Sequence, residues 1–326
     1  MNGRTDDIST HPLHPEVTDA LSAIGDYRVA SAPSAKAISS ESEGAELIVV
    51  RAPIPPEVIE REKGLRALVR HGAGLDMIPV ETATRAGVLV ANVPGANAIT
   101  VAEHVIWSAL ALLRRYPNVN DDLRARGWVE GRAHADHGRE LTGKTIGIVG
   151  MGNVGRKLAG MAQHGFGMEV ICHTRRPDSV PQSVRAMSLD QVLGTADVLV
   201  LCCPLTEQTR GLIDAAALMR LKPGALLINV ARGPVVVEDA LIDAIESGHL
   251  SGAAIDVFDH QPLPNSHRLF DLRNVILTPH MAGITEESML RMGQVVAAEI
   301  RRIAAGDLPE NLVNPEALDL YRKRFV

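Results

Sequence analysis

Residues 145–155 read Thr-Ile-Gly-Ile-Val-Gly-Met-Gly-Asn-Val-Gly, an apolar run that ends in a Gly-x-Gly-x-x-Gly turn. The turn passes into a segment whose apolar residues recur at helical spacing. In this strand–turn–helix context each glycine has a function of its own. Gly150 makes the tight turn, Gly152 lets the backbone approach a pyrophosphate, and Gly155 lets the helix pack closely on the strand. The stretch therefore predicts a dinucleotide site.

The start of the helix after this turn carries a partial positive charge, which favours a bound phosphate group. Asn153 and Val154 open the helix, where unpaired N–H groups and the helix dipole favour a negative charge. The apolar spacing runs on for about three turns, and Gly165 is expected to end the helix.

Composition excludes several classes of partner. The chain has 326 residues, of which 46% are hydrophobic and 22% charged, as in an ordinary globular protein of two domains. A net charge of −6 and few aromatic residues give no reason to expect nucleic acid or a membrane as a partner. The three cysteines lie in apolar runs without metal-ligand spacing, which predicts a cytoplasmic protein without a bound metal.

Alternating strands and helices predict an α/β fold with two doubly wound parallel sheets, one flavodoxin-like and one of the Rossmann type. The periodicity is weak before residue 46 and then regular. In the first domain we expect strands at 46–50, 66–70 and 88–91, and helices at 55–63 and 78–86. In the second we expect strands at 145–150, 168–173, 197–201, 225–230, 252–257 and 275–278, and helices at 214–220 and 237–247.

A turn-rich hinge, residues 92–97, separates the two repeating units. A capping box at Thr100 and Glu103 is expected to start a helix that runs to about Arg115, and residues 118–140 are expected to form a loop or arm. A last helix from Thr285 to Gly306 is expected to return to the first domain. The predicted substrate domain is therefore 1–98 plus 284–326, and the predicted cofactor domain is 99–283. Two domains joined by hinges predict closure over a bound substrate.

The corner after the second strand of the cofactor domain predicts which cofactor is used. An acidic residue there usually accepts the ribose 2′-hydroxyl of NAD. This chain has Thr174, Arg175 and Arg176 instead. Two guanidinium groups are suited to bind a 2′-phosphate, so we predict NADP(H) in preference to NAD(H). The alternative for these residues is a solvated basic turn, with NAD(H) then equally acceptable.

Three later stretches each follow a strand of the same domain, and they carry Arg232, Asp256 and His280. Ligands in open α/β sheets bind outside the carboxyl ends of the strands. These three side chains are therefore expected to converge beside the nicotinamide.

Taken together, the motifs resemble those of the D-isomer-specific 2-hydroxyacid dehydrogenases, from about residue 46 to residue 314. The motifs that carry the resemblance are His-Gly-Ala-Gly-Leu-Asp at 71–76, Pro-Gly-Ala-Asn at 94–97, Val-Ala-Glu-His at 101–104, the glycine turn, Cys-Pro-Leu-Thr at 203–206, and the three strand ends. In this order they are highly specific.

The resemblance implies a role for each matching residue. His280 would be the acid–base group, and Arg232 would bind the substrate carboxylate and carbonyl. Asp256 would orient the nicotinamide carboxamide. The remaining implied contacts are Pro204 and Thr206 with the adenosine, Ala73 and Gly74 with the substrate carboxylate, Asn97 at the hinge, and Arg51 with the distal part of the substrate.

Gln261 departs from the pattern of the family, in which most members have a Glu that bonds to the catalytic His and supports its positive charge. An amide orients the ring without stabilising that charge in the same way. Formate dehydrogenases, a branch of the family, also pair Gln with His, so they are one alternative. Asp259 is a candidate to replace the missing carboxylate.

The predicted reaction is reduction of a small 2-keto acid, such as glyoxylate or hydroxypyruvate, and the reverse oxidation of the D-2-hydroxy acid. Arg51 and His71 suggest a second possibility, an acid with another anionic group such as 3-phosphoglycerate or sulfolactate. A third is a cofactor-sensing binding protein without catalysis, although Arg232 and His280 argue against it. The resemblance also implies a homodimer, with the arm around Trp128 in the contact.

Overall fold

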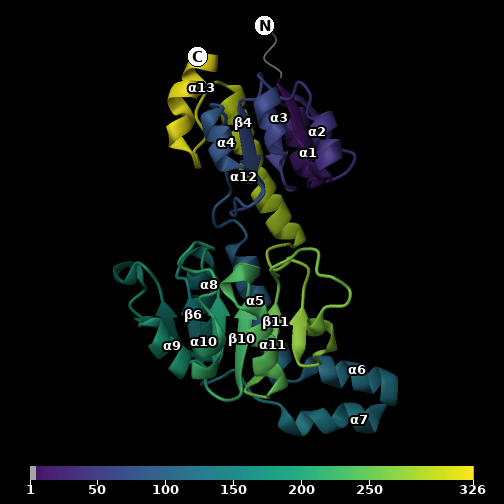
Figure 1. Ribbon diagram of the computed structural model, residues 1–326, viewed down its shortest axis with the longest axis vertical. Helices are drawn as coiled ribbons and strands as arrows, with labels where there is room; N and C mark the ends of the chain where they lie inside the picture. The colour runs from purple at the N-terminus through teal and green to yellow at the C-terminus, as the bar shows by residue number, and fades with distance from the viewer. Residues whose placement is uncertain (1–4, 326) are drawn as a thin grey trace. The chain divides into compact units, whose positions relative to one another are not determined.

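The computed structural model describes residues 5–325 (Figure 1). The chain divides into two compact units. The first comprises Met1–Asn97 and Ile284–Val326, and the second comprises Ala98–Gly283.

The first unit is built on a five-stranded parallel sheet with the strand order β2-β1-β3-β4-β5. This is the flavodoxin-like order. Its strands are β1 (Asp6–Ser9), β2 (Asp26–Val29), β3 (Leu47–Val50), β4 (Ala67–Arg70) and β5 (Leu89–Ala91). Its helices are α1 (Pro15–Ser22), α2 (Ala35–Glu41), α3 (Pro56–Arg61), α4 (Val80–Arg85), α12 (Glu286–Ala304) and α13 (Leu318–Phe325). α12 starts after Thr285, where the sequence predicts its start, and Thr285 caps it in a capping box with Ser288.

Residues 6–41 contain two strand–helix pairs that the sequence pattern did not indicate. β1 opens with two aspartates, Asp6 and Asp7, and β2 has no fully buried residue. β2 is the edge strand of the sheet, so neither of its faces needs a continuous apolar run. The usual hydrophobic signal is therefore missing from the strands that open the chain.

Asp7 is a buried carboxyl group within β1, and it makes the stability of this unit depend on pH. Burial raises its pKa from 3.8 to about 6, with smaller contributions from Glu46 and Asp6. The folded state therefore keeps this proton to higher pH than the unfolded state does. Stability should fall as pH rises from about 4 to 6, by roughly 1–3 kcal/mol in total, and stay lower above that.

Asp7→Asn is therefore expected to raise the unfolding temperature of the first unit at pH 7.5 and to have little effect at pH 4. Calorimetric scans from pH 4 to 8 measure this difference. Asp19→Asn changes an exposed carboxylate of α1 and serves as the control. A gain for Asp7→Asn that is equal at both ends of the pH range would contradict the explanation.

The second unit is built on a seven-stranded parallel sheet with the order β12-β11-β10-β9-β6-β7-β8. Its strands are β6 (Thr145–Val149), β7 (Glu169–His173), β8 (Arg185–Ala186), β9 (Val198–Leu201), β10 (Ala225–Asn229), β11 (Leu250–Ile255) and β12 (Val275–Leu277). β6 lies between β7 and β9. The strands after β6 are therefore added first on one side of it and then on the other, so the strand order reverses next to β6. The predicted fold class, two parallel α/β sheets, is confirmed. β8 was not predicted, because two exposed residues carry no periodicity.

Helices cover both faces of this sheet. They are α5 (Ala98–Leu113), α8 (Asn153–Phe166), α9 (Leu189–Thr195), α10 (Ala215–Arg220) and α11 (Glu238–Glu246), while α6 (Tyr116–Arg126) and α7 (Trp128–Ala133) pack on each other as an arm (Figure 1). Two helix predictions near the hinge were wrong. α5 begins at Ala98, so Thr100 lies inside the helix and is not its cap. Residues 116–133 are two helices rather than a loop, because Arg115 turns the chain in a left-handed conformation and α6 starts directly after it.

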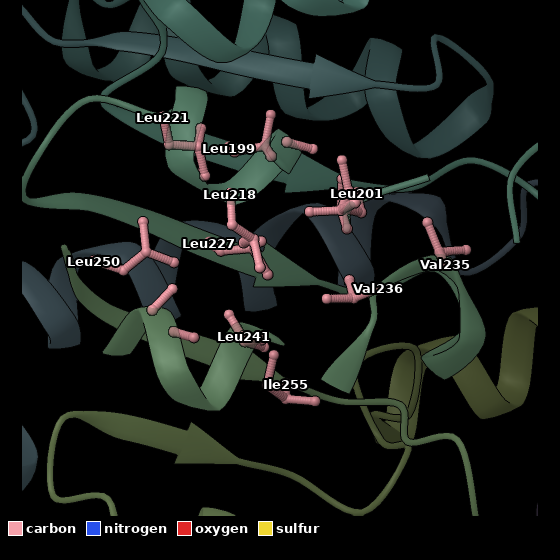
Figure 2. Close-up of a cluster of buried hydrophobic side chains, with 14 of the residues drawn as sticks. Leu199, Leu201, Leu218, Leu221, Leu227, Val235, Val236, Leu241, Leu250 and Ile255 are labelled. Carbon is pink, nitrogen blue, oxygen red and sulfur yellow. The ribbon is translucent and has the colours of Figure 1, made fainter. Parts of the chain in front are cut away.

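The side chains of the sheet alternate between two cores. Along β9, Leu199 and Leu201 face one core, and Val198 and Val200 face the other. Figure 2 shows the first of these cores, in which Leu199, Leu201 and Leu227 lie with leucines of α10 and α11. The second core contains buried residues of α5 and α8. This two-sided burial explains why the strands read as uninterrupted apolar runs.

Within residues 5–325, no helix combines the length and the apolar character needed to cross a membrane.

Candidate active site

The three glycines of the turn differ in the space around their α-carbons. Gly150 has a φ of +104°, and a Cβ there would lie 2.7 Å from the backbone nitrogen of Cys203. A Cβ on Gly155 would lie 2.3 Å from the carbonyl oxygen of Gly150. A Cβ on Gly152, by contrast, would meet no described atom within 4 Å. Gly150 and Gly155 therefore allow close packing, and Gly152 leaves an open approach to the backbone.

Helix α8 starts directly at this turn, with Gly152 at its N-cap position. None of the described side chains caps it, so its first N–H groups lack a side-chain partner at this end. Such an end is suited to bind a phosphate group. The predicted end of the helix was wrong by two residues. α8 runs to Phe166, and Gly167 ends it in a left-handed conformation with φ +58°.

The basic corner lies next to the glycine turn, because the N–H of Gly150 donates to the carbonyl oxygen of His173 at 2.9 Å. Thr174 follows this residue, and its hydroxyl accepts the N–H of Arg176 at 3.3 Å. Arg175 and Arg176 are exposed, and neither pairs with a carboxylate among the described residues. The corner therefore presents two guanidinium groups beside the site that the glycines leave open.

The turn that carries Pro204 and Thr206 is shaped by a residue that the sequence did not single out. The hydroxyl of Thr209 donates to the carbonyl oxygen of Pro204 at 2.7 Å, and it accepts the N–H of Thr206 at 2.7 Å. This turn follows β9, the strand next to β6. The Ser/Thr-turn pattern was the only local signal for Thr209.

Arg232 follows β10, and the side chain of Asn229 stabilises the conformation of this segment by hydrogen bonds. The side chain of Asn229 is buried, and its oxygen accepts the N–H of Ala231 at 3.0 Å while its nitrogen donates to the carbonyl oxygen of Arg232 at 3.1 Å. A Cβ on Gly233 would lie 2.0 Å from the carbonyl carbon of Phe258. The segment with Arg232 is thus packed directly against the segment that leads to Gln261.

His280 adopts an uncommon backbone conformation, with φ +54°. Its N–H donates to the carbonyl oxygen of Asp256 at 2.8 Å. The Nδ1 atom of its ring lies 3.1 Å from Oε1 of Gln261. Because a carbonyl oxygen only accepts, Nδ1 carries the hydrogen in this contact, and Nε2 is the nitrogen that can exchange a proton with a substrate.

Gln261 is thus the ring partner of His280, and its own amide nitrogen lies 3.5 Å from the carbonyl oxygen of Phe258. Asp259 does not replace it. The carboxylate of Asp259 lies 3.7 Å from Nε2 of His260, and both of these side chains are exposed. The partner of the histidine in this chain is therefore a neutral amide.

Asp256 is 2% exposed, and its carboxylate accepts hydrogen bonds within its own unit. The donors are the Thr278 hydroxyl at 2.7 Å and the N–H groups of Met281 at 2.8 Å and Ala282 at 3.0 Å. The sequence analysis gave Asp256 a contact with the cofactor, and these bonds to the segment around His280 were not anticipated. The donors lie about twenty residues away in the chain, so no local pattern points to them.

In the first unit, the loop with Ala73 and Gly74 is folded around the side chain of Arg70. The guanidinium group of Arg70 donates to the carbonyl oxygens of Gly74 at 3.1 Å, Val50 at 2.9 Å and His71 at 2.8 Å. The amide of Asn92 donates to the carbonyl oxygen of Ala73 at 2.8 Å, and Ala73 itself is exposed. Asn97 is the last residue of this part of the unit.

Arg51 follows β3, and its backbone N–H donates to the hydroxyl of Thr10 at 2.8 Å. Its guanidinium group donates to the carbonyl oxygen of Pro12 at 2.7 Å. Arg51 pairs with no carboxylate among the described residues, and burial lowers its pKa. A partly buried guanidinium without a carboxylate is a candidate to bind an anion.

His71 does not carry the charge that a second anion-binding group would need. It is 3% exposed, and burial, followed by the nearby charges of Arg51 and Arg70, lowers its pKa to about 4. The imidazole is therefore neutral at pH 7. The expectation that His71 attracts an anion by its charge was therefore wrong. Its imidazole can contribute hydrogen bonds only.

Among residues 5–325, no group of three or more His, Cys, Asp or Glu side chains is arranged to hold a metal ion. The open approach at Gly152, the uncapped start of α8 and the basic corner fit a dinucleotide.

Comparisons with known proteins agree with this geometry. The family model described as D-isomer specific 2-hydroxyacid dehydrogenase, NAD binding domain, matches residues 106–282. A glyoxylate reductase from Aeropyrum pernix is 34% identical over 328 residues, which cover 97% of this chain and 98% of that protein. A D-3-phosphoglycerate dehydrogenase from Methanocaldococcus jannaschii is 35% identical over 313 residues, 94% of this chain. The match spans only 59% of that relative's length.

Among solved structures, an NADPH-dependent glyoxylate/hydroxypyruvate reductase from Sinorhizobium meliloti matches with a TM-score of 0.85 and 26% sequence identity. The match covers 96% of this chain and 99% of that one.

Proposed function

The chain belongs to the D-isomer-specific 2-hydroxyacid dehydrogenase family, and from this premise we propose that it interconverts a small 2-keto acid and the D-2-hydroxy acid with NAD(P)(H). The observation that carries the proposal is the hydrogen bond between His280 and Gln261. It holds an acid–base group at the carboxyl edge of the same sheet as the glycine turn. Arg232 follows another strand at that edge.

A nicotinamide cofactor held at the glycine turn and the basic corner would supply the hydride. His280 would give a proton from Nε2 to the carbonyl oxygen of the keto acid, while Nδ1–H stays bonded to Gln261. The guanidinium group of Arg232 would pair with the substrate carboxylate and stabilise the negative charge that develops on the carbonyl oxygen. Asp256 holds the backbone of His280 and of the next two residues, and so supports the position from which the ring would act.

The basic corner supports a preference for NADP(H). We expect Arg175→Ala and Arg176→Ala each to lower the ratio of kcat/KM for NADPH to that for NADH by about 10- to 100-fold, because a charged hydrogen bond to the 2′-phosphate is lost. Arg185→Ala removes an exposed arginine of β8 that pairs with Glu169, and it is the matched control. Equal use of both cofactors by the wild type and both variants would refute the preference.

The neutral partner of His280 predicts a pH profile. Gln261→Glu places a carboxylate beside Nδ1, which stabilises the imidazolium and so raises the pKa of the ring. Reduction needs the protonated ring. The falling limb of the pH profile of kcat/KM should therefore move to higher pH by about one pH unit. Asp259→Asn, which changes the exposed carboxylate beside His260, should leave the limb in place. An unmoved limb in Gln261→Glu would count against His280 as the acid.

For the substrate, we place glyoxylate and hydroxypyruvate first. The similarity to a glyoxylate reductase along nearly its whole length supports this choice. Arg51 favours a second candidate, an acid with a further anionic group such as a phosphate or sulfonate, because its guanidinium group has no carboxylate partner among the described residues. A phosphoglycerate dehydrogenase is also among the similar proteins.

Steady-state assays separate these candidates. The panel contains glyoxylate, hydroxypyruvate, phosphohydroxypyruvate and sulfopyruvate with NADPH and NADH, and formate with NADP and NAD. Turnover of the dianionic acids that falls in Arg51→Gln would select the second candidate. Formate oxidation would select the formate dehydrogenase reaction. Tight cofactor binding without turnover of any acid would refute the proposed activity and favour a cofactor-sensing protein.

The arm formed by α6 and α7 supports the proposal of a homodimer. It exposes four large apolar side chains, with Trp128 and Val129 each 74% exposed, and the other two are Tyr116 and Leu123. Several exposed large apolar side chains on one arm support a protein–protein contact there. Sedimentation velocity should find a dimer that Trp128→Glu with Val129→Glu converts to a monomer, and a monomeric wild type would refute the proposal. The cytoplasmic location stays a prediction from composition.

A further inference from the structure

The segment around His280 is held by one buried residue, Asp256. Its carbonyl oxygen accepts the N–H of His280, and its carboxylate accepts the N–H groups of the next two residues. The hydroxyl of Thr278, two residues before His280, donates to Oδ1 of the same carboxylate at 2.7 Å. The left-handed conformation of His280 is uncommon for a residue with a side chain. It therefore depends on these contacts on both sides of the residue.

The direction of the hydrogen bonds extends this network to His104. A carboxylate oxygen only accepts, so the Thr278 hydroxyl donates its hydrogen to Asp256. Its oxygen then faces Nε2 of His104 at 3.4 Å as an acceptor. His104 must therefore carry a hydrogen on Nε2. Burial lowers the pKa of His104 and so favours the neutral ring, with its hydrogen on Nε2.

The position of His104 is fixed by the helix that carries it. α5 packs against β10, β11 and β12, the strands that precede Arg232, Asp256 and His280. The ring of Trp107, one turn further along α5, lies 5.4 Å from the His104 ring between centroids. His104 is thus a donor on a helix packed against these strands, and its hydrogen bond reaches Thr278, two residues before His280.

We propose that His104 is a positioning residue for the acid–base histidine. Its Nε2–H holds the Thr278 hydroxyl on Asp256, and this keeps His280 in the conformation in which Nδ1 meets Gln261. The inference rests on the proposed function for its catalytic consequence. Its structural part, the coupling of His104 to the His280 ring, stands without turnover.

The test compares His104→Phe, which keeps a ring but has no donor, with His104→Gln, which keeps an N–H donor at a similar distance from the backbone. For His104→Phe we expect kcat with the preferred keto acid to fall about threefold to tenfold, with the KM and the Kd of the cofactor unchanged. His104→Gln should restore kcat. Thr278→Val should show a similar loss, and combining it with His104→Phe should add little, because the two changes break one chain of hydrogen bonds.

The second readout needs no turnover. NMR titration of the His280 ring, assigned by comparison with His280→Gln, should show that His104→Phe lowers the pKa of His280 by about 0.5, since Nδ1–H loses its place beside Gln261. His104→Gln should return the pKa to the wild-type value. Trp107→Phe keeps an aromatic neighbour and should change neither readout.

The outcomes separate the positioning role from the proposed activity. If no acid is turned over but the pKa of His280 falls in His104→Phe and recovers in His104→Gln, the proposed function fails and the coupling stands. If kcat and the pKa of His280 in His104→Phe equal those of the wild type, the positioning role is overturned. Equal losses in the Phe and Gln variants would overturn it as well, because they would assign the effect to packing alone.

Discussion

Replacing His280 by Ala is expected to lower kcat for keto-acid reduction by about 10²- to 10⁴-fold, the range that a positioned general acid contributes. Nε2 of His280 is the nitrogen directed to the substrate in our proposal, because Nδ1 is bonded to Gln261 at 3.1 Å. Without the ring, the carbonyl oxygen has to take its proton from water. Stopped-flow measurement of NADPH oxidation separates this chemical step from cofactor binding.

The control for this variant is the Kd of the cofactor, measured by fluorescence, which should stay within a factor of two or three of the wild-type value. His280 has φ +54°, and Asn tolerates this conformation better than Ala. His280→Asn is therefore the variant that preserves the backbone. If it retains wild-type kcat, proton transfer by His280 is excluded.

Replacing Arg232 by Gln is the second large effect that we expect, with kcat/KM for the keto acid lower by about 10²- to 10³-fold. The guanidinium group is expected to act on both the carboxylate and the developing alkoxide, so kcat should fall and KM should rise together. Arg232→Lys keeps the charge but loses the bidentate geometry, and its activity should lie between those of wild type and Arg232→Gln.

Arg220→Gln is the matched control, because it removes an exposed arginine of α10 that pairs with Asp190. It should leave both kinetic parameters unchanged. An Arg232→Gln variant with raised KM and unchanged kcat would restrict Arg232 to substrate binding, and this result would contradict a role in stabilising the alkoxide.

The first forty-five residues and the arm show where a pattern of apolar residues fails to predict structure. β2 lies at the edge of its sheet and has no fully buried residue, so it carries no alternation. The arm is polar in sequence yet helical, and it keeps apolar side chains such as Trp128 exposed. The missing signals have different causes. In β1 the buried positions include the polar residues Asp7 and Ser9, whereas β2 and the arm leave most of their side chains partly or fully exposed.

The sequence by itself determined the parallel α/β class, the glycine turn and the strand ends that carry Arg232, Asp256 and His280. These features follow from local spacing, since apolar runs, glycines and the residue after each strand are readable in a short window. Only the tertiary structure decided which groups meet. It decided for Gln261 and against Asp259 as the ring partner of His280, gave the Asp256 carboxylate to the segment around His280, and left His71 buried and neutral. Hydrogen-bond partners and burial depend on residues far apart in the chain, and spacing within one segment does not contain them.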